Sequence, residues 1–518
     1  MTPIKETEAS WCRLPADIWL KILGLLLDDD TSCAGAAAVS RQWQAVIKPR
    51  NFARIKITPA RLADFDFMTY RNRHLVRYLW LCLELEECCY PNFRRVTIAD
   101  HHLISTSFRT LFGNLRSWDP HGNLTLDISI YSPSDMKFET DYLTVELDIP
   151  ACEINNNNKW AGKEIRRRCV LDDDLKAHFR SLMSKRRGWG HIEKRQYGEW
   201  LAAGFSRRVR PASGMGGEEE YTPMSSVEME FQPEPGHLIW RRLPSVPVVT
   251  SVLLRQQTRR RWHTKRISGL LSRLPRIQEI HYEPWREWLQ RRQDLQDDDF
   301  MDLVQSLPST LKNLVLFGIF NQHYVAILRD CPPVRAPSLN LSQAIAQASL
   351  NLECLSASYL ADASFFFDAC DPSMMWPNLR SMALTSQLLR PDTSKKTINA
   401  LLQKAATAVF GMPKLETLEI WNGRKGVAAL LRYQPSRATL TWKATWELDI
   451  SSSVIQAFEK IGPTHCVGKC DVVKELLDVG LIDPHGDAIN VLKHVCTILR
   501  PISLQQILTE EKFLQSTT

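Results

Sequence analysis

One short stretch of the sequence decides the fold: Pro413-Lys414-Leu415-Glu416-Thr417-Leu418-Glu419-Ile420. Its apolar residues follow a simple pattern: an apolar residue, two others, an apolar residue, one other and a third apolar residue. Alternation of apolar and polar residues over so few positions is typical of a short strand with one buried face. A proline stands two residues before the first apolar position. The stretch therefore predicts a strand that enters directly after a turn.

The same apolar triplet recurs along the chain. Triplets of this kind arise by chance at roughly 3–4% of positions in an average sequence, so they decide nothing without their context. The other copies are Val76-Leu79-Leu81, Val249-Val252-Leu254, Ile277-Ile280-Tyr282, Leu311-Leu314-Leu316, Leu352-Leu355-Ala357 and Leu379-Met382-Leu384. A further alternating run, residues 52–58, also predicts a strand.

Prolines and helix-like segments supply the missing context. Proline precedes the triplets at Pro247, Pro275, Pro377 and Pro413 by two residues, and at Pro308 by three. Segments with helical spacing fall between triplets, at 267–274, 300–307, 324–329 and 397–410. A strand, a turn and a helix form one unit of a leucine-rich-repeat solenoid. The steps from 249 onward are 28, 34, 41, 27 and 36 residues, so the repeat is irregular. An ordinary α/β domain is the alternative.

The first fifty residues predict a small helical unit. Leu14, Ile18, Ile22 and Leu25 recur at helical spacing, and Pro15 suits a first helical turn. A second helix is expected over 34–39, and a third over 41–47, ended by Pro49. So small a unit buries little surface by itself. Either a partner covers its apolar side chains, or residues 51–150 of the same chain do.

This unit resembles an F-box. The resemblance rests on Leu14-Pro15-Ala16-Asp17-Ile18 with Ile22 and Leu25-Leu26, followed by Val39-Ser40-Arg41-Gln42-Trp43 and Ile47. F-box units dock onto the Skp-type adaptor of a cullin-RING ubiquitin ligase, and repeats that follow an F-box receive the substrate. The resemblance thus implies the adaptor-binding residues Leu14, Pro15, Ile18, Ile22, Leu25, Val39 and Trp43.

The whole chain is similar to a group of fungal F-box proteins that end in a domain of unknown function. That group suggests no activity. The similarity rests on residues 52–55, 282–286, 439–442, Thr445-Trp446, 485–489 and 501–504.

Basic clusters support a second hypothesis. The net charge is only +7 on 518 residues, so the chain as a whole is no dedicated nucleic-acid binder. Two local runs are more basic, one within 185–210 and one formed by Arg255, Arg259, Arg260, Arg261, Lys265 and Arg266 around Trp262 and His263. Arginine beside aromatic residues suits single-stranded nucleic acid. It suits equally a solvated loop, an acidic protein partner or a nuclear import signal, and nucleic acid is the less favoured reading.

Signals for other functions are weak or missing. No nucleophile elbow, phosphate-binding loop, HExxH or kinase motif occurs. His485-Gly486-Asp487 is interpreted as a turn before a helix over 488–495, capped by Asp487. His465, Cys466, Cys470, His494 and Cys496 lack the paired spacing of zinc modules. No cofactor or metal is expected. The first eleven residues lack the apolar core of a signal peptide, and no apolar run reaches the length of a membrane helix.

Together these observations predict an α/β protein with an N-terminal helical F-box and an irregular leucine-rich-repeat-like solenoid. We expect a non-catalytic, cytoplasmic or nuclear receptor that joins a Skp-type adaptor and cullin ligase to an unidentified protein client. The alternative is a nucleic-acid-associated or general interaction scaffold. The expected segments are 1–50 (F-box), 51–150 (first repeat-like segment), 151–245 (charged insert, partly disordered), 246–443 (repeat domain) and 444–518 (C-terminal α/β cap).

Overall fold

The structure is a computed structural model of the chain. It describes residues 34–87, 97–120, 122–133, 242–255, 260–262, 264–286, 290–320, 337–460, 470–483 and 485–517, with residues 15, 17–19, 21–22, 148 and 227–228. Nearly all of the charged insert, and the helix expected over 324–329, therefore lie outside the described residues.

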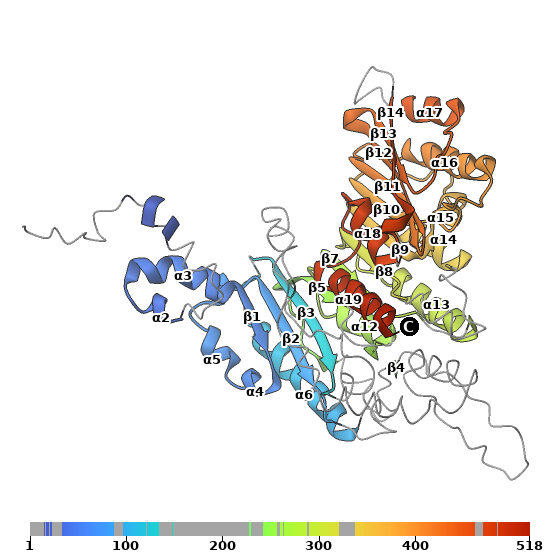
Figure 1. Ribbon diagram of the computed structural model, residues 1–518. Coiled ribbons are helices and arrows are strands. Elements are labelled where there is room, and N and C mark those ends of the chain that lie inside the picture. Colours follow the sequence, from blue (N-terminus) through green and yellow to red (C-terminus); the bar gives the residue numbers. More distant parts are fainter. Residues whose placement is uncertain are drawn as a thin grey trace, which may run out of the picture.

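Twelve strands form one open sheet in which spatial order follows chain order (Figure 1). Neighbours are parallel from the first strand through β11, as a solenoid requires. The strands are β1 (Arg54–Ile57), β2 (Tyr78–Glu84), β3 (Leu124–Tyr131), β5 (Val249–Leu254), β7 (Glu279–Tyr282), β8 (Asn313–Phe317), β9 (Cys354–Asp362), β10 (Ser381–Thr385), β11 (Thr417–Arg424), β12 (Val427–Gln434), β13 (Thr439–Ala444) and β14 (Asp471–Leu476). Two short strands, β4 (Val227–Glu228) and β6 (Arg260–Arg261), pair separately.

The apolar triplets explain the register. Their middle residues lie in one row across the sheet, which Ile55 on β1 and Leu126 on β3 complete, and all members of the row are buried. The row consists of Ile55, Leu79, Leu126, Val252, Ile280, Leu314, Leu355, Met382 and Leu418. A one-residue slip would turn a whole strand's apolar set to the other face, so this row fixes the register. The predicted strand repeat is confirmed.

Helices between the strands cover one face of this row. They are α6 (Ile98–Leu115), α12 (Thr264–Leu271), α13 (Gln290–Gln305), α14 (Leu339–Ala348), α15 (Ala363–Asp368), α16 (Lys395–Val409) and α17 (Ser452–Glu459). Their apolar side chains share one continuous core with the row. Serine caps begin three of them, since Ser338, Ser394 and Ser451 each accept a hydrogen bond from the backbone N–H three residues on. The helices expected near 267–274, 300–307 and 397–410 are present as α12, α13 and α16.

Short helices lie on both sides of β1. Before it come α2 (Ala34–Ala37) and α3 (Arg41–Ala53), and after it α4 (Pro59–Leu62), α5 (Phe65–Thr69) and the 3-10 turn η2 (Arg73–Leu75). The helix expected from Leu14 to Leu25 lies largely outside the described residues. Pro49 does not end α3, contrary to our expectation, but lies inside it. Proline costs a helix one hydrogen bond. The helix continues because Ile47 is buried and Phe52 packs on the main core.

The end of the chain departs from a simple repeat. Strands β11, β12 and β13 are antiparallel, so the parallel repeat stops at β11 and does not reach 443. Gly426, with a φ of +69°, makes the turn between β11 and β12. The short 3-10 turns η4 (Pro435–Arg437) and η5 (Val479–Leu481) follow.

Residues 444–518 do more than cap the sheet. Strand β14 lies at the end of the sheet, but α18 (His485–Leu492) and α19 (Pro501–Thr517) turn back over the face opposite the other helices (Figure 1). There they form a second core with Trp421 and Tyr359. Helix α18 begins at His485, so Asp487 lies in its first turn and is not the cap we predicted. His485 is buried because its ring stacks on Phe320 at 4.3 Å.

The insert interrupts a continuous sheet. Strand β3 precedes it and β5 follows it, and the two pair in parallel, with Leu126 opposite Val252. The expected segments 51–150 and 246–443 therefore share one sheet.

Candidate functional site

The predicted adaptor-binding residues differ in exposure. Leu14 and Leu25 lie outside the described residues. Pro15 is exposed, Ile18 is 39% exposed and Val39 is 64% exposed, whereas Ile22 and Trp43 are half-buried. Exposed aliphatic side chains are a feature of interaction surfaces when they gather in a patch. Ile18 and Val39 each keep a substantial exposed area that a partner could cover.

The base of this helical unit is fixed to the sheet. The side chain of Ser40 accepts a hydrogen bond from the Trp43 N–H at 3.2 Å, which caps the start of α3. Ile47 in the same helix is fully buried. At the segment's start, the Pro15 carbonyl accepts hydrogen bonds from the N–H groups of Ile18 and Trp19, which makes the expected first helical turn. Val39 thus projects from the turn that precedes a well-anchored helix.

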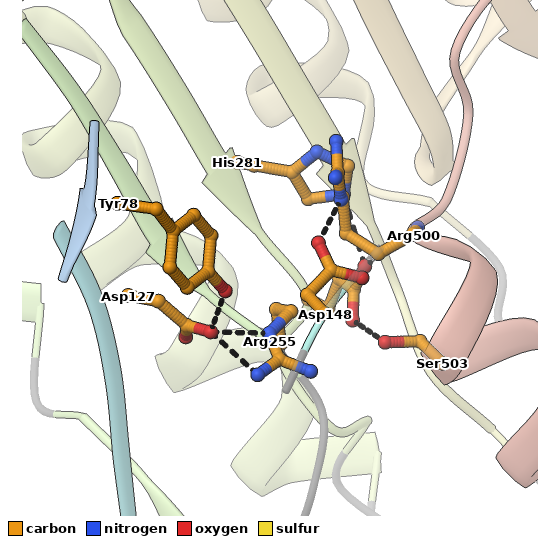
Figure 2. A network of polar contacts seen from close by, with 8 residues as sticks. Tyr78, Asp127, Asp148, Arg255, His281, Arg500 and Ser503 are labelled. Atoms are coloured by element: carbon orange, nitrogen blue, oxygen red, sulfur yellow. Dashed lines mark hydrogen bonds and ion pairs between the residues drawn. The ribbon is translucent and has the colours of Figure 1, made fainter. Parts of the chain in front are cut away.

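A buried polar network occupies the other face of the sheet, on β2, β3 and just after β5 (Figure 2). Arg255 donates from Nε and Nη2 to Asp127 Oδ2 at 2.8 and 2.5 Å, and the Tyr78 hydroxyl donates to the same oxygen. Burial, reinforced by Asp127, raises the pKa of Tyr78 well above its usual range. Both charged side chains are fully buried, so this ion pair joins neighbouring strands and faces no solvent.

Glu283, just beyond β7, binds the start of α19. It accepts hydrogen bonds from the Arg500 N–H at 3.1 Å and from Ser503 Oγ at 2.5 Å. Its Oε1 lies 2.9 Å from His281 Nε2. Arg500 also donates from Nε to Asp148 Oδ2 at 2.5 Å (Figure 2). A carboxylate that accepts from both a backbone N–H and a hydroxyl fixes the direction in which the helix leaves the sheet.

Glu419 on β11 holds the segment between α18 and α19. Its side chain is fully buried and accepts from Arg432 Nε at 2.7 Å and from the Val495 N–H at 2.9 Å. His494 Nδ1 lies 3.0 Å from its other oxygen. Burial alone would raise the pKa of Glu419, but His494 and Arg432 outweigh burial and lower it. Glu283 and Glu419 together fasten residues 493–503 across the sheet.

Two of the residues weighed as zinc ligands in the sequence, His494 and Cys496, take part in this contact. Cys496 donates its backbone N–H toward Glu419 at 3.4 Å. Burial, and then Glu419, raise the pKa of the Cys496 thiol well above its ordinary value, so the thiol stays protonated and is poorly suited to zinc. Among the described residues, no group of three or more His, Cys, Asp or Glu side chains is placed to hold a metal. His465 and Cys466 lie outside them.

Part of the second basic run is buried. Arg255, Trp262 and Arg266 lie in the interior and Arg255 pairs with Asp127, whereas Lys265 is exposed. Sequence spacing misled us because the partner carboxylate lies 128 residues earlier. The run within 185–210 lies outside the described residues.

The buried acids were not predicted as site residues. Asp127, Glu283 and Glu419 each occur within or beside a strand that alternates with apolar residues. An acid at an inward position of such a strand is the signal that indicates a buried partner.

Comparison with known proteins identifies one domain of the chain. Residues 306–500 match the model of DUF6546, a family of unknown function. A domain of unknown function is thus confirmed over these residues, and the match does not extend to the F-box pattern in the first fifty residues. No curated protein matches the chain. A crystal structure of the leucine-rich repeat-containing protein LegL7 from Legionella pneumophila is similar at 11% identity, covering 80% of this chain and 99% of that one, with a TM-score of 0.26. So weak a similarity carries no argument.

Within the described part of the chain, no helix is both long and apolar enough to cross a membrane.

Proposed function

We propose that this protein is the client-binding subunit of an SCF-type cullin-RING ubiquitin ligase. Its N-terminal helical unit binds a Skp-type adaptor, and the sheet with its helices receives a protein client. The chain catalyses nothing itself. It raises the local concentration of client lysines near the ligase, which supplies the chemistry in the cytoplasm or nucleus.

One observation supports this proposal: Ile18 and Val39 are exposed, and Val39 comes directly before the capped helix α3. Both belong to the F-box pattern in the sequence. An adaptor with an apolar groove would cover both side chains.

The fold restricts where a client can bind. In a leucine-rich-repeat receptor the sheet face free of helices is the usual binding surface. Here α18, α19 and residues 493–503 cover that face from β7 to β12. The client site is therefore sought on the helical side or at the ends of the sheet.

The alternative, a nucleic-acid-associated or general interaction scaffold, stays a proposal. Arg255, Trp262 and Arg266 are buried and are not available to phosphates or bases, so this alternative rests on the other basic residues of the two runs.

Adaptor binding tests the proposal directly. We expect the full chain to bind a purified Skp-type adaptor in the micromolar range or tighter. The double variant Ile18→Asp with Val39→Asp changes exposed positions only, and it should weaken binding about thirtyfold or more, as loss of an apolar anchor does. Lys21→Ala, an exposed neighbour, is the control. No binding by the wild type, or equal binding by the double variant, would rule out the F-box assignment.

A further inference from the structure

A groove of about 800 Å³ lies between α13 and α14 on the helical side of the sheet. Its half-buried or buried lining residues are all apolar, among them Met301, Leu307, Ala344 and Ala348. Its exposed lining residues are all uncharged and polar. Charged residues make up 24% of the chain, yet none lines the groove. The groove thus has an apolar floor and a rim of neutral hydrogen-bonding groups.

Side-chain amides form a row along this rim. Asn340, Gln343 and Gln347 lie three and four positions apart on α14, so they share one face of the helix. At a rise of about 1.5 Å per residue they stand about 4.5 and 6 Å apart. In the described part of the chain, their side-chain amides make no hydrogen bond. Each amide offers both donors and an acceptor.

An extended peptide matches this row. Its successive residues rise about 3.3 Å, so main-chain groups that point to one side recur about every 6.6 Å. Each residue presents one N–H donor and one C=O acceptor, which is what an amide side chain recognises. Side chains on the opposite side of the peptide would enter the apolar floor. A phosphate or another anion would meet no cation among the lining residues.

We propose that this groove binds an uncharged peptide segment in extended conformation. Gln343 and Gln347 hydrogen bond to its main chain, and Ala344 and Ala348 contact its side chains. The inference rests on the proposed function only in assigning the peptide to the client.

The test uses defined probes and the full chain. One library contains fluorescein-labelled heptapeptides of Ala, Leu, Val, Ser, Thr, Asn and Gln, and a matched library carries Lys or Glu at alternate positions. Fluorescence anisotropy should find binders in the uncharged library with a Kd below about 100 µM, and weaker or no binding in the charged one.

Two changes then distinguish recognition of the peptide main chain from nonspecific apolar binding. The double variant Gln343→Ala with Gln347→Ala should weaken binding about tenfold or more, and N-methylation of alternate peptide bonds should do the same. Gln456→Ala, an exposed glutamine on α17, is the matched control and should change nothing. Alanine favours helix, so the double variant should stay folded.

Three outcomes would overturn the inference: no binder in the uncharged library, a binder insensitive to the double variant, or a binder insensitive to N-methylation. Adaptor binding is measured separately. If the adaptor fails to bind while the peptides bind, only the proposed ligase function is lost.

Discussion

His494 Nδ1 lies 3.0 Å from the Glu419 carboxylate, which joins the loop after α18 to the middle of strand β11. The same carboxylate accepts from Arg432 on β12. A single buried acid therefore holds three chain segments in place, and removing it leaves two basic side chains without their partner.

Glu419→Ala is accordingly expected to destabilise the protein strongly. Loss of one member of a buried charge pair typically costs about 3–5 kcal/mol. Urea unfolding of the two proteins measures the difference. Glu416→Ala provides the control, because Glu416 pairs with Arg380 at the surface with 61% of its side chain exposed. Such a pair is worth about 1 kcal/mol or less. Equal costs for both variants would refute the structural role of Glu419.

The stability contributed by Glu419 should also depend on pH. Its pKa is lower in the folded protein than in the unfolded chain, where a glutamate titrates near about 4.3. The contribution is therefore fully present above that value and is lost as pH falls through the lower folded pKa. We expect the stability difference between wild type and Glu419→Gln to shrink between about pH 5 and pH 3, by urea titration at each pH. A difference that stays constant over this range would contradict the prediction.

The Asp127–Arg255 pair allows a second test of a buried charge. Asp127→Ala should cost about 3–5 kcal/mol, since the buried charge of Arg255 then loses the Asp127 carboxylate. Replacing both residues, as Asp127→Leu with Arg255→Met, should cost less than the single change. Thermal unfolding of the wild type, the single variant and the double variant measures both costs. The prediction is wrong if the double variant is less stable than Asp127→Ala, because the ion pair would then contribute net stability.

The apolar row across the sheet should be uniformly sensitive. Leu418→Ala removes a fully buried side chain from the last strand of this row and is expected to cost about 2–5 kcal/mol. Val473→Ala on β14, where the side chain is 42% exposed, should change stability by about 0.5 kcal/mol or less. Urea unfolding again measures both, and comparable costs would mean that the row is not a core.

The sequence predicted the strands well because their signal is local. Each triplet lies within a few residues, and its middle position became the buried row. Strand β3 was not predicted, because Asn123 occupies the first apolar position of the triplet. Leu126 and Ile128 occupy the other two positions. We expected Pro49 to end the helix because proline usually breaks helices, but the packing of Ile47 outweighs that local preference.

What the sequence did not predict depends on distant partners. Arg255 was grouped with neighbouring arginines, whereas its partner Asp127 lies far away along the chain. The covering of the second sheet face by α18 and α19 depends on Glu283 and Glu419, whose contacts span 217 and 75 residues. No local pattern encodes such a contact. The groove between α13 and α14 likewise requires knowing which helices are neighbours.

The pairing of β3 with β5 has a consequence for how this chain tolerates change. Leu126 and Val252 are adjacent, although the intervening chain is long enough to be a domain. Bringing the ends of a loop together costs entropy that grows only with the logarithm of its length, so doubling that length adds about 0.6 kcal/mol. A change in the length of this connection is thus expected to cost the sheet little, provided that it spares Asp148, which binds Arg500, and the buried residues Leu243 and Val246 that lead into β5. The ladder on either side can then stay in register.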